Sequence, residues 1–346
     1  MSRNKYLINC KETIANALAI MNELPDQQIL FVVDGDEMLK GALTDGDVRR
    51  GLLKGLEMSS LVEEFMNPNC KYIKKNTYKM SDLDAIKKIG IELLPLLNEK
   101  GQILKLIDFK KQVTAIPVDA VIMAGGEGQR LRPLTIEVPK PLLVVGNKPI
   151  MEYGIDHLVK YGINNVTISI NYLGEKVVDY FNDGSSKDIK IKYIKEETKL
   201  GTIGSVGLIQ VFHHDHILVM NSDILTNIDL EEFYREYENK DADMSVACIP
   251  YSVNVPYAIL QIENDQVTAL KEKPNLTFHS NAGIYLIKRI HIDRIPKGLF
   301  NATDLIEDLI ANKLKVIYYP ILGYWLDIGK MDDFIKAQED IKHIKF

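Results

Sequence analysis

A glycine-rich turn followed by two fixed cations is the part of this sequence best suited to chemistry. Gly125, Gly126 and Gly128 follow an apolar run, and Arg130 and Lys140 come shortly after them. Glycines leave room for backbone N–H groups to approach an anion, while the arginine offers a planar fork of donors and the lysine a compact positive charge. These residue types in this order predict a phosphate-binding site at the end of a strand.

The spacing fits neither of the two common nucleotide-binding motifs. No Lys-Ser or Lys-Thr pair follows the last glycine, as a P-loop requires, and Arg130 stands where a dinucleotide-binding turn begins its helix. A glycine-rich turn alone also serves plain tight connections, so the prediction depends on the two cations.

Residues from Gly125 to Pro141 resemble the signature of the sugar-1-phosphate nucleotidyltransferases. That family carries GG-x-G-x-R-L-x-P-L-T and then PKP, and this chain reads GGEGQRLRPLT and then PKP. One departure is Gln129, where many members carry a small hydroxyl residue. The resemblance implies that Arg130 and Lys140 are catalytic. It also implies that the triphosphate is bound by Ala124, Gly125, Gly126 and Gly128.

Two acidic residues end apolar runs elsewhere in the chain. Asp223 closes the run VMNSD, and Asp327 closes YWLD. The family resemblance implies that both are metal ligands and that the cofactor is Mg²⁺, which takes oxygen ligands from carboxylates and phosphates. For Asp223, a turn or helix-capping role is the alternative.

Two motifs resemble the family's sugar-phosphate elements. They are Glu272-Lys273-Pro274 and Asn281-Ala282-Gly283. The resemblance implies that Lys273 holds the phosphate of the sugar-1-phosphate, while the sugar hydroxyls are read by Glu272, Asn281 and the Gly283 backbone. An exposed, charged hairpin is the alternative interpretation of the first motif.

The run EETKLGT, residues 196 to 202, resembles the loop that reads the nucleotide base. The resemblance assigns nucleotide contacts to Glu197, Gly201 and Thr202. Guanine presents two adjacent N–H donors that one carboxylate can accept, whereas uracil and thymine present one N–H between two carbonyls. Glu197 therefore favours GTP over UTP or dTTP, although a glutamate beside another glutamate is also an ordinary surface feature.

The first 115 residues contain an internal repeat. Two similar sets of elements are predicted, first a helix at 14–21, strands at 29–33 and 39–43 and a helix at 45–53, then a short element at 62–66, an extended stretch at 71–75, a helix at 82–89 and strands at 93–97 and 103–107. The two halves resemble tandem CBS domains, a Bateman module. This resemblance implies dimerisation, hence a homo-oligomer, and a nucleotide or pathway product as effector.

Thr44 and Asp47 lie in the run GALTDGD, which resembles the nucleotide-binding element of CBS domains. The resemblance implies that Asp47 accepts hydrogen bonds from ribose hydroxyls and that Thr44 lies beside a phosphate. The second half of the repeat lacks the threonine. Helix capping is the alternative role for both residues, since Thr and Asp cap helices well.

A mixed-charge segment, 110–117, predicts a boundary between two domains, 1–115 and 118–346. Beyond it, short apolar strands alternate with helices, which indicates an α/β fold with a doubly wound, mostly parallel sheet, the Rossmann-like fold that the family resemblance also implies. The strands are expected at 121–123, 166–170, 189–194, 217–220 and 244–249, and the helices at 151–161, 174–181, 204–211 and 230–237. Ligands of such sheets gather at the carboxyl ends of the strands.

Composition narrows the class of protein further. The 346 residues are 46% hydrophobic and carry a net charge of −6, which argues against a nucleic-acid partner. No apolar run predicts a membrane span or a signal peptide, so we expect a cytoplasmic protein without a membrane partner. Three cysteines without metal-ligand spacing are expected to be reduced.

Together these motifs predict transfer of a nucleotidyl group to a hexose-1-phosphate, with release of pyrophosphate. CBS domains ahead of a transferase resemble the glucosamine-1-phosphate guanylyltransferases of legionaminic acid biosynthesis, so GTP and glucosamine-1-phosphate are the expected substrates. Mannose-1-phosphate and heptose-1-phosphate guanylyltransferases, and relatives that use UTP or dTTP, are alternatives. A non-catalytic, nucleotide-sensing subunit is an alternative of another class.

Overall fold

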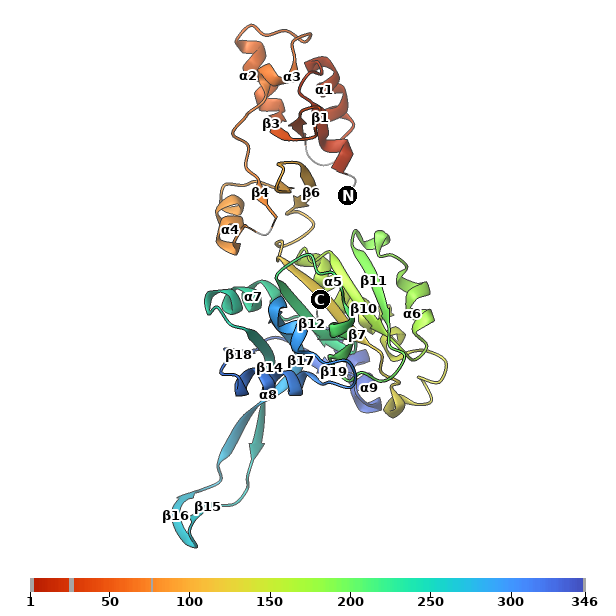
Figure 1. Cartoon of the computed structure of the whole chain (residues 1–346), viewed down its shortest axis with the longest axis vertical. Coiled ribbons are helices and arrows are strands. Elements are labelled where there is room, and N and C mark those ends of the chain that lie inside the picture. Colours follow the sequence, from red (N-terminus) through yellow and green to blue (C-terminus); the bar gives the residue numbers. More distant parts are fainter. Residues whose placement is uncertain (1–2, 25–27, 76, 345–346) are drawn as a thin grey trace. The chain divides into compact units, whose positions relative to one another are not determined.

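The computed structural model describes residues 3–24, 28–75 and 77–344 (Figure 1). The chain divides into two compact units, Met1–Ala115 and Ile116–Phe346. None of the helices in the described ranges has the length and apolar character needed to cross a lipid bilayer.

The first unit consists of two halves with the same topology. Each half has a three-stranded sheet whose middle strand pairs parallel to the first strand and antiparallel to the third, in the orders β1-β2-β3 and β4-β5-β6. The register shifts at equivalent places in the two middle strands. The internal repeat is therefore confirmed. Its elements are β1 (Leu7–Asn9), α1 (Ile14–Asn22), β2 (Ile29–Val33), β3 (Leu39–Thr44), α2 (Asp45–Leu53), α3 (Val62–Phe65), β4 (Ile73–Lys74), α4 (Met80–Lys88), β5 (Leu93–Leu97) and β6 (Ile103–Asp108).

The second unit is built on a seven-stranded sheet with the order β11-β10-β7-β12-β17-β14-β18. Only β17 runs against the others, because it pairs antiparallel with both β12 and β14. The expected mostly parallel sheet is confirmed. Its strands are β7 (Val118–Ala124), β10 (Asn165–Ile170), β11 (Lys190–Lys195), β12 (His216–Asn221), β14 (Met244–Asn254), β17 (Asn275–Lys288) and β18 (Val316–Pro320).

Five α-helices of this unit flank the sheet or follow it in the chain, within the described residues. They are α5 (Ile150–Lys160), α6 (Gly174–Phe181), α7 (Leu230–Asn239), α8 (Ala302–Ala311) and α9 (Met331–Asp340). The helix expected at 204–211 is wrong in type, because Gly204–Leu208 forms a 3-10 helix. The glycines there let the backbone approach its neighbours, and a Cβ on Gly204 would lie 2.7 Å from the Gly298 carbonyl oxygen.

A buried cluster beneath the glycine-rich turn joins elements that are distant in the sequence. Leu131 follows the turn, and Ile150 and Tyr153 belong to α5. Leu225 lies in the short strand β13 (Ile224–Thr226), and Ile328 directly follows β19 (Trp325–Asp327), the strand that pairs with β13. Burial of these apolar side chains fixes the turn against the segments that carry the acidic candidates.

A long two-stranded ribbon extends from this sheet and is seen in pale blue in Figure 1. The outer parts of β14 and β17 form its base, and β15 (Ile259–Glu263) and β16 (Gln266–Lys271) form its tip. We call residues 249–280 the arm. The sequence did not predict it, because strand 244–249 was expected to end where the arm begins.

Candidate active site

The glycine-rich turn leaves β7 at Ala124, and its shape depends on Gly128. This residue has a φ of 61°, in the left-handed region that favours glycine. A Cβ on Gly128 would lie 2.9 Å from Thr135 Cγ2 and 3.1 Å from Lys140 Cβ. The Thr135 hydroxyl donates to the Gly128 carbonyl oxygen at 2.8 Å. The turn thus folds back on the segment that carries Lys140.

Lys140 meets both acidic candidates at the end of this turn. It is buried, its ammonium donates to Asp223 Oδ2, and it lies 4.0 Å from Asp327 Oδ1. Pairing of β13 with β19 sets the two carboxylates side by side, since Ile224 lies opposite Asp327. The structure therefore brings together three residues that are far apart in the sequence.

The two carboxylates are incompletely satisfied by the protein. Asp223 Oδ1 and Asp327 Oδ1 are buried and accept no hydrogen bond. Burial, and then the neighbouring Asp223 carboxylate, raises the pKa of Asp327 to about 6, although the charges of Lys140 and Arg130 act in the opposite direction. Two carboxylates facing each other with unpaired oxygens are a costly arrangement unless a cation joins them.

This donor set fits a divalent cation. Within the described residues no group of three or more His, Cys, Asp and Glu side chains is placed to hold a metal. Mg²⁺ suits such a site because it keeps waters and takes phosphate oxygens besides one or two carboxylates. Asp223 and Asp327 are the residues that would hold it.

Arg130 lies on the exposed side of the same cluster. It follows the turn in a short 3-10 helix, and its Nη2 would be 3.3 Å from a Cβ placed on Gly329. Its charge lowers the pKa of Asp327, which places the guanidinium within electrostatic reach of the carboxylates. An exposed guanidinium so placed can still bind an anionic ligand.

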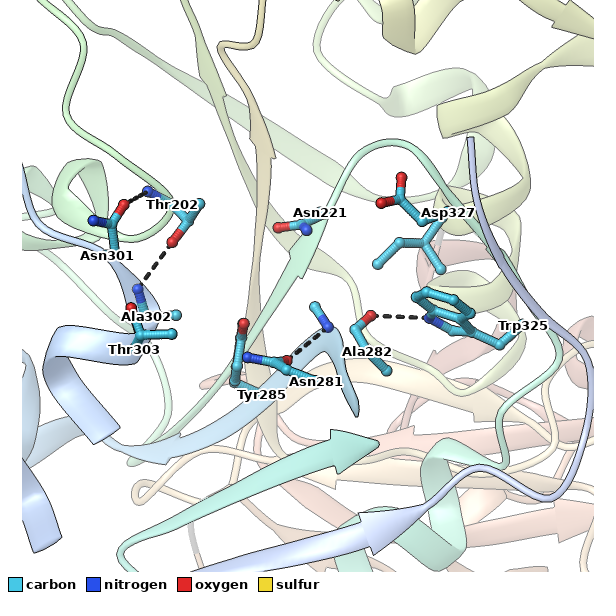
Figure 2. Close-up of a pocket in the computed structure, with 12 residues that line it drawn as sticks. Thr202, Asn221, Asn281, Ala282, Tyr285, Asn301, Ala302, Thr303, Trp325 and Asp327 are labelled. Carbon is cyan, nitrogen blue, oxygen red and sulfur yellow. Dashed lines mark hydrogen bonds between the residues drawn. The ribbon is translucent and has the colours of Figure 1, made fainter. Parts of the chain in front are cut away.

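A cavity of about 310 Å³ opens beside Asp327, and Figure 2 shows its lining. Thr202 and Asn301 lie on one side of it, with Trp325 and Asp327 on the other. Its lining residues are Thr202, Asn221, Ile224, Asn281, Ala282, Gly283, Tyr285, Asn301, Ala302, Thr303, Trp325 and Asp327. The volume is in the range of small-molecule sites.

The backbone near the cavity is held in place by specific contacts. Gly283 has a φ of 72°, and a Cβ there would lie 2.6 Å from Asn221 Nδ2. Its N–H donates to Asn281 Oδ1 at 2.9 Å, and the Trp325 indole donates to the Ala282 carbonyl oxygen at 2.9 Å. Asn281 and Gly283, both expected at the sugar site, thus lie in the cavity wall.

The expected base-reading loop is anchored by a buried glutamate. Glu196 accepts from the Ser169 hydroxyl at 2.6 Å, and a Cβ on Gly125 would lie 3.1 Å from its Oε1. Glu197, the expected base reader, is exposed. Lys199 forms an ion pair at 2.7 Å with Glu127, which ties this loop to the glycine-rich turn.

Gly201 and Thr202 hold the other end of the same loop in place. Gly201 has a φ of 81°, and a Cβ there would lie 2.5 Å from the Phe300 carbonyl oxygen. The Thr202 hydroxyl accepts from the Ala302 N–H at 2.9 Å, at the start of α8. Thr202 lines the cavity, while its hydroxyl is engaged by this helix.

Glu272 and Lys273 are not brought to the cavity of their own chain. Both are exposed on the arm, beyond the outer end of β17. This placement matches the alternative interpretation of the first motif as an exposed hairpin.

Comparison with known proteins identifies the family. The nucleotidyl transferase family model matches residues 119–344. The chain belongs to the nucleotidyl transferase family. Its glycine-rich turn, Lys140, Asp223 and Asp327 all lie within this nucleotidyl transferase region.

Individual relatives agree with this assignment. The mannose-1-phosphate guanylyltransferase of Mycobacterium tuberculosis is 32% identical over 233 residues, which are 65% of this chain and 64% of that protein. The chain therefore spans less than two thirds of that relative's length. HddC from Yersinia pseudotuberculosis is 26% identical with a TM-score of 0.50, over 65% of this chain and 99% of that structure.

A third comparison concerns the fold alone. A Bacillus anthracis structure, called in its description a glucose-1-phosphate thymidylyltransferase and solved with sucrose, is 24% identical with a TM-score of 0.55. The match covers 66% of this nucleotidyl transferase chain and 97% of that one.

Several cavity residues were missed by reasoning from the sequence. Asn221, Tyr285 and Trp325 line the cavity, and Glu196 supports the glycine-rich turn. Asn221 and Glu196 stand at the carboxyl ends of β12 and β11, which is a signal that the strand pattern could have supplied. Tyr285 lies within a strand, where an aromatic residue is ordinary core, so no local signal distinguishes it.

In the first unit, Thr44 and Asp47 form a capping box at the start of α2. Asp47 Oδ2 accepts from the Thr44 N–H at 2.9 Å and from its hydroxyl at 2.6 Å, while Arg50 donates to Oδ1 at 2.5 Å. The capping role that was the alternative for these two residues is therefore present.

Proposed function

We propose that this protein transfers a nucleotidyl group from an NTP to a sugar-1-phosphate and releases pyrophosphate. The observation that carries the proposal is the meeting of Lys140, Asp223 and Asp327 beside a glycine turn and an open cavity. A triphosphate would bring a Mg²⁺ ion that the two carboxylates could hold, and the turn offers backbone donors to the phosphate oxygens. The cavity then receives the sugar.

The reaction needs no covalent enzyme intermediate. An oxygen of the sugar phosphate attacks the α-phosphorus in line, the bond between this phosphorus and the bridging oxygen breaks, and pyrophosphate departs with the electron pair. Bound Mg²⁺ would neutralise phosphate charge. Arg130 and Lys140 orient the phosphates and stabilise the charge that gathers on the leaving group, and the turn fixes the direction of attack.

Guanine is the base that we propose. The Mycobacterium tuberculosis relative is named a guanylyltransferase, and Glu197 offers a carboxylate on the loop expected to read the base. The same relative makes mannose-1-phosphate the first acceptor to test, ahead of the glucosamine-1-phosphate that the domain order favours. Asn221 and Asn281 in the cavity wall can exchange hydrogen bonds with hydroxyls of either sugar.

A pyrophosphate-release assay with four NTPs and several hexose-1-phosphates tests the proposal. We expect release with GTP and one acceptor, and none without the acceptor. Release with UTP or dTTP in place of GTP would overturn the choice of base. No release with any pair would overturn the transferase and favour the non-catalytic, nucleotide-sensing alternative.

For the first unit we propose a regulatory role, as tandem CBS domains of residues 1–115 ahead of a transferase of residues 118–346. The support is the repeated topology of its two halves. Thr44 and Asp47 would turn from their capping contacts toward a bound nucleotide, since a capping hydroxyl and carboxylate can also serve a ribose phosphate.

Calorimetry of the full chain with adenine and guanine nucleotides tests this role in the presence of saturating NTP at the other unit. Binding that is lost in Thr44→Val but kept in Thr44→Ser would support it. Heat that is unchanged by Thr44→Val would overturn the role of this residue.

A further inference from the structure

The arm has an apolar face that its own chain leaves uncovered. Tyr251 lies opposite Phe278 in the β14–β17 register, and Val253 lies opposite Leu276. Tyr251 is 59% exposed and Phe278 is 56% exposed. At the tip, Leu260 with Leu270 and Ile262 with Val267 also face each other, and all four are exposed.

The opposite face of the same ribbon is polar. Ser252 pairs with Thr277, and Asn254 pairs with Asn275. Side chains alternate between the faces of a strand, so this register separates the apolar residues from the polar ones. Such a pattern is typical of an antiparallel ribbon that packs one face on another surface.

The arm also has free strand edges. Inside the unit, β14 pairs with β18 only as far as Cys248, and β17 pairs with β12 only from Ile284 onward. Beyond these points each strand of the arm, within the described residues, has one neighbouring strand. A two-stranded ribbon is only marginally stable alone in water, so both its face and its edges favour a partner.

None of the side chains that line the cavity supplies a cation for a sugar phosphate. Among its lining residues the only charged side chain is Asp327, and the nearby Lys140 already pairs with Asp223. A phosphate next to a carboxylate needs a positive group to hold it. The cavity wall is therefore incomplete for this substrate.

Lys273 is the cation expected at this position, but the arm places it far from the cavity of its own chain. Asn275 is six positions before Asn281 along the extended strand β17, which places it roughly 20 Å from this residue of the cavity wall. Lys273 lies beyond Asn275, where Val255 donates to the Pro274 carbonyl oxygen and continues the ribbon outward. Lys273 has a φ of 42°, in the left-handed region, which costs conformational energy for residues other than glycine.

We propose that the arm docks on a second copy of this chain and places Lys273 at the partner copy's cavity. The exchange is reciprocal, because each copy has one arm and one incomplete cavity, as two-fold symmetry requires. The arm's apolar face packs on the partner copy and Lys273 binds the phosphate of the sugar-1-phosphate there. The role of Lys273 rests on the proposed function, whereas docking of the arm does not.

Mixing two inactive variants tests the exchange. Lys273→Ala lacks the arm cation and Arg130→Ala lacks the triphosphate cation, so each alone should be nearly inactive. After unfolding and refolding together in equal amounts, half of the dimers are mixed and each has one complete site, which gives about a quarter of wild-type activity. Lys271→Ala, at the end of β16 and just before Lys273 in the arm, is the control and should keep wild-type activity.

Two outcomes of the mixing experiment would overturn the inference. A mixture that remains inactive means that Lys273 acts in its own chain, with the arm folded back. Full activity of Lys273→Ala alone means that the phosphate is held otherwise. An inactive wild type with every substrate pair instead overturns the proposed function, and docking is then decided by sedimentation.

Sedimentation measures arm docking without any activity. We expect a dimer for the wild type and a folded monomer for the double variant Tyr251→Ser with Phe278→Ser. The matched control, Ser252→Ala with Thr277→Ala, changes the polar face at the same ladder positions and should remain dimeric. A monomeric wild type, or a double variant that dimerises like the wild type, would overturn the exchange.

Discussion

At the scale of single residues, the central feature is a lysine held between two aspartates. Lys140 is buried against Asp223, and both carboxylates keep an oxygen without a hydrogen-bond partner. Such a cluster contributes little to stability, because buried charges cost desolvation energy that one ion pair repays only in part. Its value lies in the ligand that completes it.

Arg130→Ala should lower turnover at least about a hundredfold, because one preorganised cation facing the phosphates is lost. The protein should stay folded, since Arg130 is exposed. Arg132→Ala is the matched control, because Arg132 is also exposed and lies 4.0 Å from Glu127. Turnover of the Arg130 variant within a few-fold of wild type, measured by pyrophosphate release, would contradict its role.

Asp327→Asn should raise the thermal midpoint at pH 7. The folded state holds the pKa of Asp327 at about 6, above its ordinary value, so the folded protein binds more protons than the unfolded chain between about pH 4 and 6. The free energy of unfolding of the wild type therefore decreases as the pH rises through this window. The asparagine has no such titration.

Scanning calorimetry without Mg²⁺ at pH 7 and pH 4 measures the effect. The variant should be the more stable of the two proteins at pH 7, and the difference should shrink at pH 4. An asparagine variant that is less stable than wild type at pH 7 would contradict the view that this carboxylate is kept for binding.

At the scale of elements, short segments around the turn carry the site. Gly128→Ala should destabilise the protein by about 1 to 3 kcal/mol, because the backbone is left-handed and the new Cβ meets Thr135 and Lys140. Gly126→Ala is the control for stability, since nothing lies within 4 Å of a Cβ there. Equal urea midpoints for the two variants would contradict the packing described for Gly128.

Helix α5 supports the acidic segment through a buried histidine. His157 Nε2 donates to the Ile228 carbonyl oxygen at 2.7 Å, just beyond β13. Burial lowers the pKa of His157 to about 4, so between about pH 6.5 and 4 the unfolded chain binds a proton that the folded state does not. Stability should fall as the pH falls through this window.

Urea unfolding of wild type and His157→Gln at pH 7.5 and pH 4.5 measures the contribution of His157 to the free energy of unfolding. The glutamine amide can still donate to Ile228 but does not titrate. Between pH 7.5 and pH 4.5, the free energy of unfolding of wild type should fall by up to about 3 kcal/mol more than that of the variant. An equal loss in both proteins would show that His157 is not the group responsible.

At the scale of the whole molecule, local patterns in the sequence predicted the repeated first unit and the parallel strands of the second. Strand 29–33 and helices 45–53 and 174–181 have the expected bounds. These segments are short and their apolar periodicity is clear, so local signals suffice. The glycine-rich turn was also predicted, because a left-handed residue such as Gly128 is signalled by its residue type alone.

Other features depended on contacts that no local pattern reveals. The pairing of β13 with β19, which brings Asp223 to Asp327, joins segments a hundred residues apart. The arm was missed because residues 250–280 alternate polar and apolar side chains around charges, as an ordinary surface hairpin does. Glu196 rather than its neighbour Glu197 is buried because of strand register, which a one-residue slip would reverse.

The central claim is that the cluster of Lys140, Asp223 and Asp327 serves nucleotidyl transfer. Phosphorus NMR of the whole protein with GTP, mannose-1-phosphate or glucosamine-1-phosphate, and Mg²⁺ tests it directly. The account predicts a nucleotide sugar and pyrophosphate in equal amounts, with no GMP or inorganic phosphate. Unchanged GTP with every hexose-1-phosphate, or GMP formed without a nucleotide sugar, would contradict it.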